Sequence, residues 1–163
     1  MSVAAKLRQY LDDNKVEYTV LAHPRTYTAQ DTAQSAHVAG KEMAKSVVVK
    51  TGDRFVLAVV PAPNRVDLER LREVLGSKDA RIADESEFAS LFLGCEAGAM
   101  PPFGNLYGVE VYADQSLAQD EEIVFNACTH EDAIRMRYKD FERLANPKIA
   151  NFAASGQKAT GLC

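Results

Sequence analysis

The sequence predicts a single-domain α+β fold with one mixed β-sheet. At 163 residues, the chain has the length of one domain that can bury its own core. Hydrophobic residues make up 47% of it and charged residues 26%, which is ordinary for a globular protein and excludes a disordered chain. Short helix and strand patterns follow one another without repeating as βαβ units, and this favours α+β over α/β.

The clearest strand signal is a pair of apolar, β-branched runs in the first half of the chain. Residues 44–51 read AKSVVVKT and residues 54–61 read RFVLAVVP, with Gly52-Asp53 between them. Two such runs joined by a glycine-containing pair predict a β-hairpin. Both runs are almost continuously apolar, so we expect a sheet that is covered on both faces.

Before this hairpin, the pattern predicts a helix, a strand and a second short helix. Ser2 is placed to cap the first helix, whose apolar residues share one face at helical spacing: Val3, Leu7, Tyr10 and Leu11. The strand is expected at residues 18–21. The second helix opens at Thr28, with Asp31 at the reciprocal capping position.

After the hairpin, capping signals mark two further helices. Asp67 begins one that Gly76 ends, and Asp84 with Glu87 forms a capping box for a helix running to about residue 92. A final short helix is expected at residues 140–145. Strands are expected at residues 81–83, 109–113, 122–126 and 133–138. Residues 94–104 have no regular period and are expected to be loop. We place the domain at residues 1–154 and a polar tail at residues 155–163.

Charge and cysteine content indicate the compartment. The net charge of −4 argues against a protein held on nucleic acid by bulk charge, although a small basic patch could still meet an RNA end. Three cysteines without CxxC spacing (Cys95, Cys128 and Cys163) favour reduced thiols. No apolar run approaches a membrane span. We therefore expect a cytoplasmic protein with neither DNA nor a membrane as a partner.

Common catalytic motifs are absent from the sequence. It has no P-loop, no GxGxxG after a strand, no HExxH and no GxSxG. The three histidines (His23, His37 and His130) lack zinc-ligand spacing with a cysteine, so we expect neither a metal nor an organic cofactor. A cysteine nucleophile paired with His130 stays open as an alternative, but cysteine is more often a small buried hydrophobe.

Two features stand out as candidates for chemistry. Lys45 begins an apolar strand, which places its ammonium at the end of the sheet, either extending to water or facing a pocket. The run GCEAGAMPPFG combines glycines with Pro101-Pro102 in a sharply turned loop around Gly98. Backbone amides in such a loop can approach a ligand closely, although a purely structural turn has the same composition.

These features, in this order, resemble the YbaK-like aminoacyl-tRNA deacylases, which include the editing insertion of bacterial prolyl-tRNA synthetase. The resemblance runs from about Tyr27 to Leu144. It rests on YTAQDTAQ, AKSVVVK, LAVVPAPNRVDL, GCEAGAMPPFG, FNACTHEDAIRM and DFERL. The resemblance implies that the mixed sheet is partly closed.

The resemblance also implies which residues form the site. The family's strand lysine falls on Lys45, near the terminal adenosine of the tRNA, where a cation can meet phosphate. The family's GxxxP loop falls on Gly98 and Pro102 and lines the aminoacyl pocket. The remaining substrate-binding residues implied are Ser46, Ala99, Met100, Pro101 and His130. A structural role for His130 is about as well supported as a role in the pocket. This chain differs from many relatives at Ser46, where they carry asparagine or threonine, and at Cys128, where they often carry glycine.

The implied reaction is hydrolysis of a mischarged aminoacyl-tRNA that carries a small amino acid, with an aminoacyl-tRNA synthetase as a candidate second partner. An aminoacyl ester is already activated, so positioning a water and stabilising the oxyanion suffice. Amides around Gly98 are the expected donors, and the 2′-hydroxyl of the tRNA helps to activate the water. Asp114 is expected to shape a turn. The alternative is a tRNA- or nucleotide-binding module of the same fold without catalysis.

Overall fold

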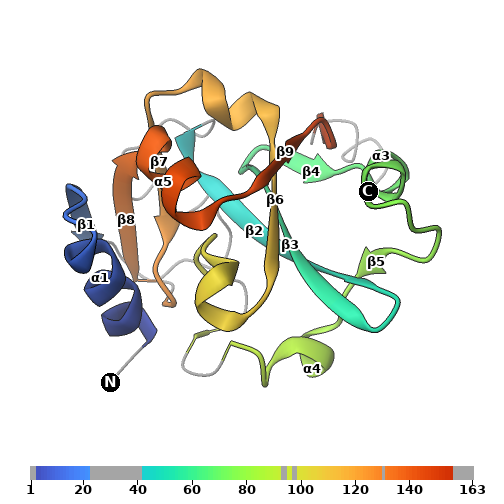
Figure 1. The fold of residues 1–163 in the computed structure, drawn as a ribbon, viewed down its shortest axis with the longest axis horizontal. Coiled ribbons are helices and arrows are strands. Elements are labelled where there is room, and N and C mark those ends of the chain that lie inside the picture. Colours follow the sequence, from blue (N-terminus) through green and yellow to red (C-terminus); the bar gives the residue numbers. More distant parts are fainter. Residues whose placement is uncertain (1–2, 23–41, 93–94, 97–98, 130, 156–163) are drawn as a thin grey trace.

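Three β-sheets organise the molecule (Figure 1). The computed structural model describes residues 3–22, 42–92, 95–96, 99–129 and 131–155. Within these ranges the strands form a five-stranded sheet of order β5-β2-β3-β6-β9, a three-stranded sheet of order β1-β8-β7 and a two-stranded sheet of order β10-β4. The α+β class with a mixed sheet and short helices is confirmed. The expectation of partial closure was wrong, because the five-stranded sheet ends in two open edges, β5 and β9.

The five-stranded sheet contains the predicted hairpin with the predicted bounds. Its strands are β2 (Ala44–Thr51), β3 (Arg54–Pro61), β5 (Arg81–Ile82), β6 (Glu110–Asp114) and β9 (Lys148–Ala150). β2 pairs antiparallel with both β3 and β5, whereas β3–β6 and β6–β9 are parallel pairs, so the sheet is mixed. Gly52, with φ of 60°, takes the first of the two turn positions between β2 and β3, as a type II′ turn requires.

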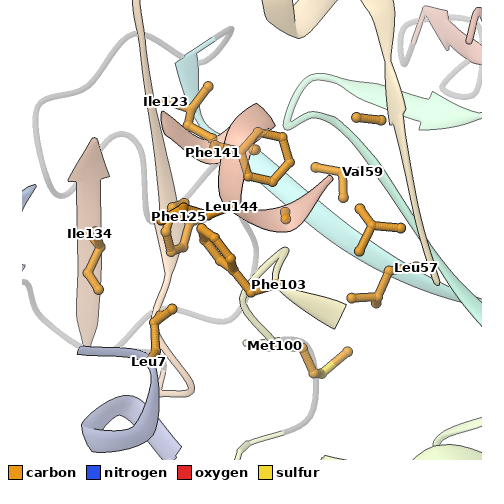
Figure 2. Close-up of a cluster of buried hydrophobic side chains, with 14 of the residues drawn as sticks. Leu7, Leu57, Val59, Met100, Phe103, Ile123, Phe125, Ile134, Phe141 and Leu144 are labelled. Atoms are coloured by element: carbon orange, nitrogen blue, oxygen red, sulfur yellow. The ribbon is translucent and has the colours of Figure 1, made fainter. Parts of the chain in front are cut away.

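The central strand β3 is buried on both faces, as its continuous apolar run predicts. Leu57 and Val59 join the main hydrophobic cluster on one face (Figure 2). Val56, Ala58 and Val60, at the alternating positions, join a second cluster on the other face. Because successive strand residues point to opposite faces, one strand supplies two cores.

The three-stranded sheet closes one side of the main cluster. β1 (Tyr18–Ala22), β7 (Glu122–Asn126) and β8 (Asp132–Arg137) pair antiparallel, and α1 (Val3–Asp13) packs Leu7 and Leu11 into the same cluster. α1 and the three strands lie together on the left of Figure 1. α5 (Tyr138–Ala145) starts two residues earlier than expected. The helix predicted from Thr28 lies outside the described residues.

Capping residues position α3 and α4 as predicted. The Asp67 side chain accepts hydrogen bonds from two backbone amides at the start of α3 (Leu68–Leu75), and Gly76 ends that helix. Asp84 and Glu87 form the capping box of α4 (Glu85–Phe88). α4 ends before the expected residue 92, because the chain turns after Phe88 so that both Phe88 and Phe92 are buried in edge-to-face contact. No helix in the described ranges has the length and apolar character to cross a membrane.

Asp114 anchors the C-terminal segment through hydrogen bonds. The strands in that segment were not predicted from the sequence. Its buried carboxylate accepts hydrogen bonds from the Phe152 and Ala153 amides, both at 2.8 Å, and from the Ser116 amide at 3.0 Å, where η3 (Gln115–Gln119) begins. The expectation that Asp114 shapes a turn is confirmed. β10 (Ala153–Ser155) pairs antiparallel with β4 (Asn64–Val66), so the boundary expected after residue 154 falls inside β10.

Gly104, at the start of η2 (Gly104–Tyr107), is required by close packing. An added Cβ would collide with the Val109 carbonyl oxygen and lie 2.9 Å from a Val111 methyl group. Because both neighbours belong to a buried segment, we expect Gly104→Ala to destabilise the fold by about 2 kcal/mol in urea denaturation. Gly108→Ala is the matched control, since its added Cβ meets nothing within 4 Å and carries only the strain of a φ of 72°. Equal costs in the two variants would contradict this account.

Candidate functional site

Lys45, the second residue of β2, is a half-buried cation. It lies opposite Val60 of β3 and keeps its ammonium partly out of water. Burial lowers its pKa below the ordinary lysine value, and no partner among the described residues counteracts that shift. Lys50 in the same strand differs, because it pairs with Glu87 at 3.5 Å and lies 5.6 Å from the centre of the Phe55 ring. Within the described part of the chain, Lys45 is therefore a cation without an anionic partner.

The beginning of β2 runs beside β7, which brings a second polar group to the same place. Met43 and Val124 form a parallel bridge and share a small hydrophobic cluster. Lys45 and Asn126 each lie two residues beyond this bridge in their strands. Asn126 is 6% exposed, and its buried Oδ1 has no hydrogen-bond partner among the described residues. A buried acceptor without a partner is unusual and marks Asn126 as a candidate for binding a donor.

Sequence reasoning did not single out Asn126. The available signal was its position, because asparagine ends an otherwise apolar strand, EIVFN. That signal is weak without the structure, since strands commonly end in polar residues. What distinguishes Asn126 is its nearly complete burial two residues beyond the bridge between β7 and the start of β2.

The predicted loop is tied to the end of β7. The Glu96 amide donates to the Cys128 carbonyl at 2.8 Å, and the Cys128 amide donates to the Ala99 carbonyl, also at 2.8 Å. Since β7 neighbours β2, these bonds bring Ala99 toward the end of the sheet that carries Lys45. Ser46 follows Lys45, and its buried Oγ has no hydrogen-bond partner in the described part of the chain. Gly98 and His130, two further predicted site residues, lie outside the described residues.

The loop run of residues 99–102 is buried throughout. Only part of this run can supply backbone amides to a ligand. The Ala99 amide donates to the Glu96 carbonyl at 3.0 Å, and prolines carry no N–H. The Met100 amide is therefore the amide in this run that makes no hydrogen bond to a described backbone carbonyl. Its side chain belongs to the main cluster, in which Figure 2 also labels Phe103 of the same loop.

The larger surface hollows of the described residues do not include the predicted site residues. One, of about 670 Å³, lies along β1 and β8, where Arg135 and Arg137 face Glu17 and Glu122. Another, of about 490 Å³, lies between the end of η3 and the start of α5. Acidic groups offset the two arginines in the first hollow. We therefore take Lys45, which has no anionic partner within the described ranges, rather than pocket size, as the guide to the site.

The described residues bear on two alternatives, a hydrolase with a cysteine nucleophile and a hydrolase with a metal site. Cys95 and Cys128 form a disulfide there, so the expectation of reduced thiols was wrong for this pair. Two residues 33 positions apart give no sequence signal of pairing, but the loop and the β7–β8 turn bring them together. Within the described ranges, no three His, Cys, Asp or Glu side chains are grouped as metal ligands would be.

Comparison with known proteins identifies the family. The family model for the aminoacyl-tRNA editing domain matches residues 23–144, about three quarters of the chain. This chain belongs to the aminoacyl-tRNA editing domain family. The match spans Lys45, residues 94–104 and the turn between β7 and β8. The resemblance predicted from the sequence motifs is confirmed.

Among the relatives, one aligns along most of its length and another only as part of a larger protein. The chain is 28% identical over 152 residues to the multifunctional Ser/Thr-tRNA deacylase ProXp-y of Escherichia coli (strain K12), covering 90% of each protein. It is 36% identical over 107 residues to the proline–tRNA ligase of Xanthomonas axonopodis pv. citri, of which it covers 19%. A crystal structure of a protein proposed to be a trans-editing enzyme for prolyl tRNA synthetase superposes with a TM-score of 0.82 at 23% identity, covering 95% of this chain and 99% of that one. That structural likeness confirms the fold.

Proposed function

We propose that this editing-domain protein is an aminoacyl-tRNA deacylase that acts in trans and hydrolyses the ester of a mischarged tRNA carrying a small amino acid. One observation carries the proposal: the half-buried Lys45 ammonium has no partner among the described residues, in a chain of the aminoacyl-tRNA editing domain family. The chain aligns with nearly all of ProXp-y but with only a fifth of the proline–tRNA ligase. This difference supports action in trans.

Lys45 and Gly98 are the residues to which we assign catalysis. The Lys45 ammonium binds phosphate beside the terminal adenosine and so positions the ester. Desolvation strengthens such a contact, because a partly dry ammonium interacts more strongly with an anion. Gly98 leaves room for the ester carbonyl. Residues 99–102, Ser46 and His130 form the walls of the aminoacyl pocket.

The chemistry requires a bound water and a donor for the oxyanion. Water attacks the ester carbonyl, the carbonyl oxygen becomes an oxyanion, and the ester bond to the terminal ribose breaks to release the amino acid. We assign the Met100 amide to the oxyanion, because it is the amide in the 99–102 run that is not committed to a described carbonyl. The 2′-hydroxyl of the tRNA assists the water, so the mechanism requires no metal or organic cofactor.

Specificity in this proposal comes from size exclusion. Buried Ala99 and Met100 limit the space beside the ester, so alanine, serine, threonine or cysteine can enter and larger residues cannot. The name of the Escherichia coli relative points to seryl and threonyl esters for that protein. The partner in this proposal is aminoacyl-tRNA. An aminoacyl-tRNA synthetase is a second partner where editing directly follows charging. Neither DNA nor a membrane has a role. A cytoplasmic location follows, because aminoacyl-tRNAs are made there.

A panel of charged tRNAs tests the proposal. Seryl, threonyl, alanyl and cysteinyl esters are each prepared on tRNAs cognate and non-cognate for the amino acid, with leucyl-tRNA as the larger substrate. We expect rapid release of one or more of the small amino acids and slow release of leucine. Binding of all the tRNAs without release of any amino acid would instead identify a tRNA-binding module.

A further inference from the structure

A pair of cysteines joins the two segments that border the proposed site. Cys95 lies beside Glu96 in the segment that leads to Ala99 and Met100, and Cys128 lies in the turn after β7, with the disulfide between them. The backbone bonds from Glu96 to Cys128 and from Cys128 to Ala99 flank this link. We propose that Cys95 and Cys128 form a reversible redox site, oxidised by small peroxides and reduced by thiols, that sets the position of the Ala99 and Met100 backbone.

The backbone at Cys128 indicates that its sulfur has a role. Cys128 has a φ of 74°, in the left-handed region where a side chain is disfavoured and glycine is favoured. It is also fully buried. A cysteine in a position that suits glycine carries strain that its thiol side chain must offset. The structure bonds this side chain to Cys95.

Cys95 is the more accessible member of the pair. It is half-buried and lines a cavity of about 50 Å³ with Phe88, Phe92 and Met100. A water molecule needs roughly 10–15 Å³ of such volume, so hydrogen peroxide fits and a glutathione-sized oxidant does not. Cys95 therefore reacts first, with the oxidant. Buried Cys128 reacts second, with the oxidised sulfur of Cys95.

Tyr107 provides a hydrogen-bond donor for either sulfur. Its hydroxyl lies 3.6 Å from Sγ of Cys95 and 3.7 Å from Sγ of Cys128. Burial raises the pKa of Tyr107 to about 12, so the phenol stays protonated at neutral pH. A neutral hydroxyl that donates to sulfur stabilises the thiolate, the form that reacts with peroxide. The Lys6 ammonium, 5.4 Å from the centre of the Tyr107 ring, adds positive charge nearby.

The oxidation balances in two steps. The Cys95 thiolate attacks one peroxide oxygen, the O–O bond breaks, and a sulfenic acid forms with release of hydroxide. The Cys128 thiolate then attacks the Cys95 sulfur, which forms the S–S bond and displaces hydroxide. In sum, two thiols and one hydrogen peroxide give one disulfide and two waters. A thiol reductant reverses the change by exchange through a mixed disulfide.

The link should affect both the fold and the site. Joining residues 33 positions apart restricts the unfolded chain, so the oxidised protein should melt roughly 5–10 °C higher than the reduced one. In the oxidised state the Ala99 and Met100 backbone is held against the β7–β8 turn. Reduction should therefore loosen the donors proposed for the oxyanion and lower deacylation about three- to tenfold. This last consequence rests on the proposed function.

The test compares the reduced and oxidised full-length protein carrying Cys163→Ser, which prevents links through that cysteine. One equivalent of hydrogen peroxide should lower the intact mass by about 2 Da, raise the melting temperature and slow hydrogen exchange in the peptide that contains Ala99 and Met100. Dithiothreitol should reverse all three changes. Cys95→Ser, treated identically, corrects for methionine oxidation and should show none of the three.

Cys128→Gly separates the redox role from folding, since glycine suits the φ of 74°. This variant should fold and lose the response to peroxide. The proposal is overturned if peroxide leaves both thiols free in the Cys163→Ser protein. It is equally overturned if the disulfide forms but neither exchange at Ala99 nor the melting temperature changes. These readouts involve no tRNA, so they stand even if the protein deacylates nothing, and that result would count only against the proposed function.

Discussion

Replacing Lys45 with methionine should lower the kcat/KM of deacylation by about 10- to 150-fold, because a charge-assisted contact to phosphate contributes about 1.5–3 kcal/mol. Methionine keeps the apolar length of the side chain and removes only the charge. The desolvated ammonium has no described partner, so the free energy of unfolding should stay the same or rise by up to about 1 kcal/mol. Loss of activity without loss of stability is the signature of a residue kept for a ligand.

Lys50→Met is the matched control for this prediction. Lys50 lies in the same strand, but it already pairs with Glu87 and contacts the Phe55 ring. Its replacement should cost up to about 1 kcal/mol of stability and leave deacylation near the wild-type rate. Deacylation at the wild-type rate by folded Lys45→Met would remove Lys45 from the mechanism. Equal loss of activity in both variants would show that the loss comes from the change in overall charge and not from the position of Lys45.

Asp114→Ala should cost the fold about 3–5 kcal/mol, because it leaves the buried amides of Phe152 and Ala153 without their acceptor. Burial alone would raise the pKa of Asp114, but the hydrogen bonds from Ser116, Phe152 and Ala153 outweigh it, so the pKa is lowered. A carboxylate with a lowered folded-state pKa stabilises the fold above its unfolded pKa of about 4. That contribution disappears as the pH falls through the folded-state pKa.

Urea denaturation at several pH values checks this prediction. The difference between wild type and Asp114→Ala should be constant near neutral pH and shrink below about pH 4. Asp53→Ala, at an exposed position of the β2–β3 turn, is the control and should change stability by no more than about 0.5 kcal/mol. A cost for Asp114→Ala that is the same at every pH would show that the charge of this carboxylate is not what secures β10.

Local signals predicted those parts of the fold that depend on neighbouring residues. The two runs around Gly52-Asp53 gave the bounds of β2 and β3, and Asp67 with Gly76 gave the bounds of α3. The short strands β4, β9 and β10 escaped prediction. Each has three residues, too few for an alternating pattern, and each forms by pairing with a distant strand. Open edges and separate sheets are likewise properties of long-range pairing, so the sequence pattern did not reveal them.

The same division applies to the candidate site. Lys45 and the proline-rich loop were visible in the sequence, because a charge at the start of an apolar strand and a glycine–proline run are local features. The burial of Asn126 and the pairing of Cys95 with Cys128 were not visible. The pairing depends on the approach of Cys128 to Cys95 across more than 30 residues of intervening chain. The roles of Gly98 and His130 remain predictions from the resemblance.

The claim that this chain is an ester hydrolase is tested most directly by following free serine released from seryl-tRNA in large molar excess over the protein. The account predicts steady release of many equivalents per protein molecule, an intact tRNA at the end, and the same reaction slowed in Lys45→Met. Tight binding of seryl-tRNA, alanyl-tRNA and threonyl-tRNA with amino acid release no faster than in buffer would contradict it.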